Sequence, residues 1–294
     1  MQETLRVKAL LSYPVKSMRA ISHETSTLQV TGLPHDRQYM VVNDTGDFIT
    51  QRKIPRMALI SPKLTASHLI FSVDGTESAR VELAPALAQG KRHALRVFDA
   101  DCYGIDLGPL VSDWLTEFLG EAPGGGALKL MCFDPQSRRS VSKKHLKGED
   151  SHTLFADGYP YLVASEATLS YLNAALLEKG SNAVTMDRFR PNIVVDGTIA
   201  FDEFEWEALE ATRSRVRLGL RKPCQRCEIV TVDQTNGEIP KKGQPLATLV
   251  KVSPLMAKGL KGGYFGMNTT LIEGAGDTLT VGDTLSIARC VASS

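Results

Sequence analysis

Two cysteines three residues apart, Cys224 and Cys227, are the residues of this chain best suited to chemistry. They end the segment Lys222-Pro223-Cys224-Gln225-Arg226-Cys227, so Arg226 lies between them. A fixed positive charge beside a thiol favours the thiolate, which is the form that binds metals and attacks electrophiles. The segment therefore indicates a thiolate site that holds a metal or acts as a nucleophile.

Three ordinary roles of a CxxC pair compete for these positions. A thioredoxin-type pair places its attacking thiol at the start of a helix, whereas the β-branched run 228–233 predicts a strand. Structural zinc needs four ligands, commonly from a second pair, and the sequence holds no second CxxC. Buried core cysteines seldom neighbour residues such as Pro223 and Arg226. The local pattern disfavours all three roles and leaves all three open.

The composition restricts the class of protein. The chain has 294 residues, 43% of them hydrophobic and 23% charged, which suits one large globular domain or two smaller ones. Its net charge of +1 predicts no nucleic-acid partner. The sequence has no signal-peptide pattern and no apolar run of membrane-spanning length. The five cysteines are too scattered for a disulfide framework: Cys102, Cys132, Cys224, Cys227 and Cys290. Together these features predict a cytoplasmic protein with no membrane span.

Short β-like runs that could position the site fill the first hundred residues. Strands are predicted over 5–11, 27–30 and 38–42, and a hairpin is predicted from the runs 68–73 and 79–83 around a turn. Several short strands at this spacing indicate a barrel or a sandwich.

Two helices and one linker are predicted further along. Apolar residues recur at helical spacing over 110–119 and again over 165–179, where Ser165 is a suitable N-cap. The Pro- and Gly-rich segment 121–126 predicts a domain boundary, and a strand over 128–133 follows it.

The remaining segments predict a loop and more strands. Residues 135–152 are polar and carry both signs of charge, so they either steer anions to a site or form an ordinary solvated loop, and the ordinary loop is favoured. Short β runs return from residue 192 onward.

Motifs in both halves of the chain resemble the MOSC domain and the β-barrel domain that precedes it in one branch of that family. The segments 189–195 and 222–233 are similar to MOSC motifs, and 13–17 and 32–37 are similar to the preceding domain. The branch contains the mitochondrial amidoxime-reducing component and bacterial reductases of N-hydroxylated bases. The resemblance covers essentially the whole chain and implies an α+β, predominantly β protein. It implies an N-terminal MOSC-associated β-barrel domain at 1–122 and a MOSC β-barrel domain with a few helices at 127–292.

The resemblance also implies a molybdenum cofactor, in which a pterin dithiolene holds molybdenum and one protein cysteine completes the sulfur ligands. Cys227 matches that ligand, and thiolate sulfur suits such a metal. Arg226 would stabilise the thiolate or the anionic metal centre. The other matching positions are Lys16, Ser17 and Arg37 for the cofactor phosphate, and Asp157, Arg190 and Asn192 for the pterin. Arg52 is a weaker candidate of the same kind.

The implied activity is reduction of small N-hydroxylated substrates, such as hydroxylaminopurines and amidoximes. The chain carries no cysteine cluster for an iron–sulfur centre. The electrons are therefore expected from a separate ferredoxin-like protein, flavoprotein or cytochrome. Two other hypotheses stay open: sulfur transfer through a Cys227 persulfide, and cofactor binding without catalysis. The motifs also leave pyridoxal phosphate binding open.

Overall fold

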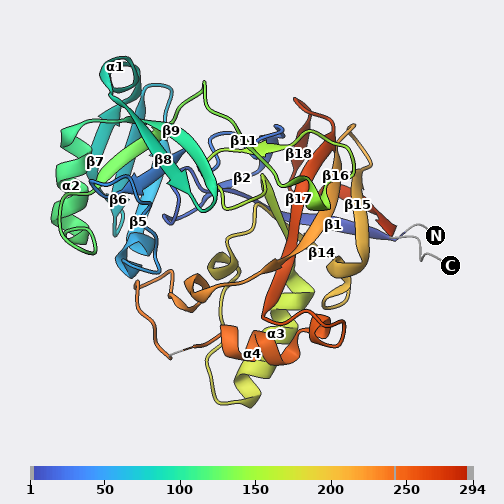
Figure 1. Cartoon of the computed structure of the whole chain (residues 1–294). Helices are drawn as coiled ribbons and strands as arrows, with labels where there is room; N and C mark the ends of the chain where they lie inside the picture. The colour runs from blue at the N-terminus through green and yellow to red at the C-terminus, as the bar shows by residue number, and fades with distance from the viewer. Residues whose placement is uncertain (1–2, 242, 290–294) are drawn as a thin grey trace.

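The computed structural model describes residues 3–241 and 243–289, so Cys290 lies outside the described residues. Strands dominate the chain and a few helices accompany them, which confirms the predicted α+β, mainly β class. Figure 1 shows two strand-rich parts side by side, with the first hundred residues forming most of the left part.

Seven strands close into a barrel on the right of Figure 1. Their order is β14-β13-β17-β16-β15-β19-β1, and an antiparallel pairing of β1 with β14 closes the ring. Closure leaves these strands with no unpaired barrel edge. The strands are β1 (Thr4–Ser12), β13 (Tyr161–Ser165), β14 (Ile193–Asp196), β15 (Trp206–Ala211), β16 (Arg217–Gln225), β17 (Tyr264–Glu273) and β19 (Thr284–Arg289), with β2 (Ile21–His23) paired to β1.

The left part contains two further sheets. One has the order β4 (Tyr39–Val42), β10 (Lys129–Phe133), β9 (Ala100–Asp106) and β8 (Arg92–Val97). The other is β5 (Ile60–Leu64), β6 (His68–Val73) and β7 (Thr76–Glu82), which confirms the predicted hairpin. The helix α2 (Pro109–Leu119), predicted over 110–119, packs with both sheets around the buried residues Val41, Phe71 and Leu115. A short helix, α1 (Leu83–Gln89), follows β7.

The chain crosses between the two parts more than once. Strand β1 belongs to the barrel, where it pairs with β14 and β19. Strand β10 follows the predicted linker 121–126, yet it pairs with β4 and β9. The predicted domains 1–122 and 127–292 therefore stay a prediction, and strand pairing runs across that boundary in both directions.

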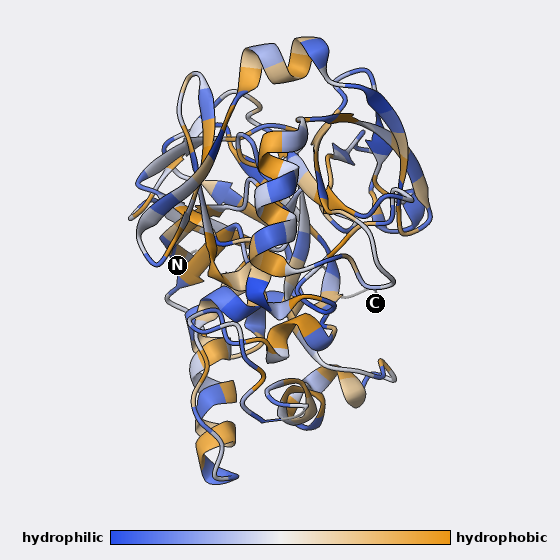
Figure 2. Ribbon diagram, turned by 90° about the vertical axis from the view of Figure 1, so that its left-hand side faces the viewer, coloured by the Kyte–Doolittle hydropathy of each residue, from blue (hydrophilic) through white to orange (hydrophobic). Residues whose placement is uncertain are grey.

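Two helices lie below the barrel in Figure 1: α3 (Glu166–Glu178) and α4 (Leu246–Val252). α3 matches the helix predicted over 165–179, and Ser165 caps it by accepting a hydrogen bond from the Ala167 amide at 3.2 Å. It connects the parallel pair β13 and β14, as a crossover helix does. Hydrophobic and hydrophilic residues alternate along the helices (Figure 2), which is typical of elements with one buried face. Across the described part of the chain, no helix is long and apolar enough to span a membrane.

Two predicted strands are wrong. The sequence predicts a strand over residues 228–233, but Glu228–Thr231 form a 3₁₀ helix. The Thr231 hydroxyl donates to Glu228 O at 2.7 Å and the Arg188 guanidinium donates to Thr231 O at 3.1 Å, so local and tertiary contacts override β propensity. The strand expected at 27–30 lies instead at Thr25–Thr27.

The remaining elements are short. They are β3 (Thr25–Thr27) with β18 (Thr278–Thr280), β11 (Arg139–Ser140) with β12 (His152–Thr153), and the 3₁₀ helices Pro55–Leu59, Lys143–His145, Met186–Phe189, Asp202–Glu205, Glu228–Thr231 and Pro254–Met256.

Candidate functional site

One pocket is lined by all eight residues that the sequence singled out. They come from segments far apart in the chain and flank the ends of barrel strands and of β4. The exposed Arg52 lines the same pocket. The eight are Lys16, Ser17, Arg37, Asp157, Arg190, Asn192, Arg226 and Cys227, and the lining also includes Thr50, Tyr159, Tyr161, Cys224 and Asn268.

Three of these residues have a left-handed backbone although none is glycine. The φ angles are +68° at Ser17, +48° at Arg37 and +54° at Arg190. Such conformations cost free energy in non-glycine residues, and they concentrate at functional sites where the surrounding structure enforces them. The surrounding structure therefore holds these turns, which carry predicted cofactor residues, in conformations that backbone stability alone does not favour. Such turns are typical of a functional site.

Lys16 is buried at the base of this arrangement. Its ammonium donates to Phe155 O at 2.9 Å and forms an ion pair with Asp157. Burial lowers the pKa of Lys16, and the nearby Asp157 carboxylate opposes that effect. Only 6% of the residue is exposed, so Asp157 is the charge that compensates a buried cation.

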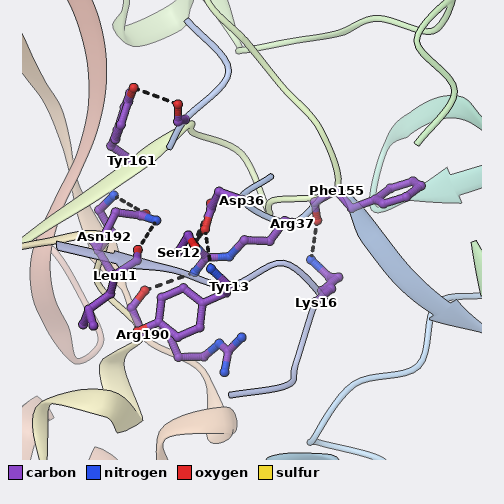
Figure 3. A network of polar contacts seen from close by, with 12 residues as sticks. Leu11, Ser12, Tyr13, Lys16, Asp36, Arg37, Phe155, Tyr161, Arg190 and Asn192 are labelled. Atoms are coloured by element: carbon purple, nitrogen blue, oxygen red, sulfur yellow. Dashed lines mark hydrogen bonds and ion pairs between the residues drawn. The ribbon is translucent and has the colours of Figure 1, made fainter. Parts of the chain in front are cut away.

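Arg37 and Arg190 lie on the Tyr13 ring, as Figure 3 shows. Their guanidinium carbons are 4.2 Å and 4.3 Å from the centre of the ring. Arg37 also binds both carboxylate oxygens of Asp36 at 2.7 Å and the Arg190 carbonyl at 3.1 Å. Burial raises the pKa of Tyr13 to about 12, although the two arginines oppose the shift. Burial, reinforced by Arg37, lowers the pKa of Arg190 to about 10.

Asp157 presents its carboxylate to the open side of the pocket, and its side chain is 73% exposed. Desolvation would raise its pKa, but attraction to Lys16, Arg37 and Arg226 is stronger and lowers the pKa to about 2. The segment before it is held from behind by Arg139, which is buried and donates to the carbonyls of Leu154 and Ala156.

Asn192 uses its side chain to connect two strands. Its Oδ1 accepts from the Leu162 amide and its Nδ2 donates to Leu11 O, both at 3.1 Å (Figure 3). One donor hydrogen and one lone pair of this amide are left for a ligand. Asn192 therefore fixes the strand ends that surround the pocket and keeps part of its capacity to bind.

The two cysteines differ in their surroundings. Cys227 is exposed, whereas Cys224 is half-buried. One terminal nitrogen of Arg226 lies 2.9 Å from Cys224 Sγ, and the other donates to Phe189 O at 2.9 Å. The guanidinium predicted to stabilise the Cys227 thiolate is thus hydrogen-bonded to Cys224, and Cys227 presents its sulfur to the pocket.

The pocket is electropositive. Among its described lining residues, one carboxylate (Asp157) faces five cationic side chains: Lys16, Arg37, Arg52, Arg190 and Arg226. Within residues 3–241 and 243–289, no three His, Cys, Asp or Glu side chains gather closely enough to hold a metal ion.

Sequence reasoning missed three residues that shape the site: Tyr13, Asp36 and Arg139. Tyr13 and Asp36 lie inside the motifs 13–17 and 32–37, so their positions were visible but their partners were not. Arg139 lies in the segment 135–152, for which the sequence favours an ordinary solvated loop over one that steers anions to a site. No local pattern distinguishes it from its exposed neighbour Arg138, whose side chain pairs with Asp150.

Comparison with known proteins agrees with this architecture. Residues 4–122 match the MOSC N-terminal beta barrel domain and residues 150–286 match the MOSC domain. The mitochondrial amidoxime reducing component 2 of Rattus norvegicus is 33% identical over 85% of this chain and 72% of that protein. The mitochondrial amidoxime-reducing component 1 of Xenopus laevis is 31% identical over 94% of this chain and 82% of its own. The molybdenum cofactor sulfurase of Bos taurus is 29% identical over 93% of this chain but only 31% of that protein.

The fold and the site therefore define a protein with a MOSC domain and its N-terminal β-barrel domain. The chain belongs to the MOSC family that includes the mitochondrial amidoxime-reducing components. This membership supports a function associated with the molybdenum cofactor.

Proposed function

We propose that this protein is a molybdenum-cofactor-dependent reductase that converts N-hydroxylated substrates, such as hydroxylaminopurines and amidoximes, to the parent compounds. The observation that carries the proposal is the meeting of eight motif residues, from both family-matched parts of the chain, around one electropositive pocket. The names of the similar amidoxime-reducing components support the substrate class.

The residues present fit the cofactor. Two buried arginine nitrogens in the pocket wall, Arg190 Nη2 and Arg226 Nε, have no hydrogen-bond partner among residues 3–241 and 243–289. Unsatisfied buried donors are costly unless a ligand or water accepts from them. The pocket also combines excess positive charge with an exposed thiol, which suits an anionic group that carries a thiophilic metal.

Each residue has a role that its position allows. Lys16, Ser17 and Arg37 would hold the phosphate, and Asp157, Arg190 and Asn192 would bind the pterin. Cys227 would ligate the metal, and Arg226 would orient Cys224 beside it. When bound, the cofactor supplies two-electron redox chemistry, which protein side chains cannot provide.

The reaction consumes two electrons and two protons for each N–OH group. The N–O bond breaks, the oxygen leaves as water, and the parent nitrogen compound remains. We propose that a separate ferredoxin-like protein, flavoprotein or cytochrome supplies the electrons. The protein is proposed to act in the cytoplasm.

A second candidate is sulfur transfer, with Cys227 carrying a persulfide. The exposure of this thiol and the similarity to a molybdenum cofactor sulfurase favour it over the remaining alternatives. In that case the purified protein would contain cyanide-labile sulfur and no molybdenum.

Metal and pterin analysis of protein made in a molybdenum-replete host tests the proposal, with Cys227→Ala as the variant and Cys224→Ala as the matched control. We expect wild type and Cys224→Ala to contain molybdenum and Cys227→Ala to lose most of it. Wild type that lacks molybdenum, or Cys227→Ala that retains all of it, would overturn the ligand assignment. Donor-driven reduction of benzamidoxime then separates a reductase from a protein that only binds the cofactor.

A further inference from the structure

A second depression adjoins the candidate site and has a different character. It encloses about 570 Å³, within the range of small-molecule sites. Thr50 and Arg52 line both this depression and the candidate pocket, so the two adjoin at these residues. Its other lining residues are Asp47, Phe48, Lys53, Arg96 and Phe98.

The backbone conformation of Phe98 costs free energy. It occupies the two-residue turn between β8 and β9, with a φ of +54°. Hairpin turns of this length favour Gly or Asn at left-handed positions, and phenylalanine is disfavoured there. The residue is also 43% exposed, so its side chain adds little to the buried core. A strained backbone that carries an exposed apolar ring indicates that this residue has a binding role at the surface.

The neighbours of Phe98 hold its ring in place. The Phe48 ring lies 5.1 Å from it, tilted by 59°. Lys16 Nζ lies 5.5 Å from the centre of the Phe48 ring and 5.7 Å from that of Phe98. Because Lys16 also pairs with Asp157 in the candidate pocket, one buried cation supports both the pocket and the rings beside it.

We propose that Phe98 and Phe48 form an aromatic platform on which a planar aromatic N-hydroxylated substrate stacks while its N–OH group enters the candidate pocket. Every nucleobase has a π face that stacks on aromatic side chains. The exposed cations Arg52, Lys53 and Arg96 line the same depression and suit the electron-rich ring nitrogens of such a base. The platform would give planar substrates an advantage over aliphatic amidoximes. The inference rests on the proposed reductase function and adds its substrate preference.

The test compares 6-hydroxylaminopurine, which has a ring to stack, with acetamidoxime, which has none. The variant is Phe98→Gly, which removes the ring and relieves the left-handed backbone strain at the same time. Phe98→Tyr should restore stacking. Asp74→Gly is the matched control, because Asp74 also has a positive φ, of +51°, in the exposed β6–β7 turn.

We expect Phe98→Gly to raise KM for 6-hydroxylaminopurine about five- to tenfold, the loss that one aromatic contact implies. The kcat for both substrates and the KM for acetamidoxime should stay within about twofold of wild type, since stacking acts on binding alone. Phe98→Tyr and Asp74→Gly should behave as wild type. An unchanged KM for the purine in Phe98→Gly, or equal losses for both substrates, would overturn the platform.

Binding without turnover separates this proposal from the proposed function. Saturation-transfer NMR of 6-hydroxylaminopurine with the protein, in the absence of an electron donor, reports stacking alone. If wild type reduces neither substrate but binds the purine in a Phe98-dependent manner, the reductase proposal fails and the platform stands. If wild type reduces both and Phe98→Gly binds the purine normally, the platform fails and the reductase proposal stands.

Discussion

Arg226 places a guanidinium nitrogen 2.9 Å from the sulfur of Cys224 and leaves Cys227, the next residue in the chain, facing the pocket. The two thiols of the CxxC pair thus differ: Cys224 is hydrogen-bonded within the protein, and Cys227 is exposed. Backbone bonding fixes the arrangement, since the Arg226 amide donates to Gly263 O at 2.8 Å. This division suits a single sulfur ligand with a supported neighbour better than a dithiol centre.

Thiol mapping should reveal this division directly. In native protein without bound metal, iodoacetamide should modify Cys227 before Cys224, because Cys227 is the exposed one among the four cysteines that the structure describes. Cys102 and Cys132 should react on the order of a hundredfold more slowly still, since both are buried and burial raises their pKa, to about 11 for Cys132. Peptide mass spectrometry over time measures each site separately. Faster labelling of Cys224 than of Cys227 would contradict the structure.

The Lys16–Asp157 pair should make the free energy of unfolding fall at low pH. Asp157→Asn leaves the buried Lys16 ammonium without its carboxylate, and we expect a loss of about 1–2 kcal/mol at pH 7, less than for a fully buried pair because Asp157 is largely exposed. The Asp157 pKa is lowered to about 2, so its contribution is complete above pH ~4 and disappears as the pH falls toward 2.

Urea unfolding at pH 7, 4 and 2 measures this difference. Lys16→Met combined with Asp157→Asn should recover part of the loss, because the buried charge is then absent as well. A difference between wild type and Asp157→Asn that stays constant down to pH 2 would exclude the ion pair as its source.

The sequence could predict which residues meet at the candidate pocket because family motifs carry them, whereas the chemical role of each residue stays a prediction. It could predict α3 because Ser165 and the spacing of Leu169, Leu172 and Leu176 are local signals. It could not predict the 3₁₀ helix at Glu228–Thr231, where contacts from the distant Arg188 decide the conformation. Local patterns also cannot show that Tyr13 lies between two arginines, since Arg190 is 177 residues away in the chain.

Glu203 should affect stability in the opposite direction from the Lys16–Asp157 pair, by lowering the free energy of unfolding as the pH rises. Its carboxyl is fully buried, and Thr168 donates to one oxygen at 2.8 Å. Burial raises its pKa to about 7. The folded state therefore keeps a proton that the unfolded state loses above pH ~4.5, so stability falls as the pH rises from 4.5 to 7. We expect Glu203→Gln to become more stable than wild type at pH 8, by about 1–3 kcal/mol, and to be nearly neutral at pH 5.

Chemical denaturation at pH 5 and pH 8 tests this, with Glu205→Gln as the control because Glu205 is exposed and pairs with Lys258. The control should show no such pH-dependent gain. A Glu203→Gln variant that is equally destabilised at both values would mean that this carboxyl is ionised in the folded protein.

Arg139 should matter for cofactor retention although it does not line the pocket. It donates to the carbonyls of Leu154 and Ala156 and so positions the segment that carries Asp157. Arg139→Met leaves these buried carbonyls without their donor, and we expect a loss of about 2–4 kcal/mol in stability. Molybdenum content should fall about tenfold, as when a residue that orients a metal site is removed.

The adjacent Arg138→Met is the control, because Arg138 is exposed and pairs with the exposed Asp150, so its loss should change stability by less than about 1 kcal/mol. Molybdenum analysis at a temperature where both variants are folded separates positioning from unfolding. If folded Arg139→Met retains as much molybdenum as Arg138→Met, the conformation of the Asp157 segment does not control cofactor binding. If it loses molybdenum while folded, the loop that sequence alone assigned to solvent is part of the site.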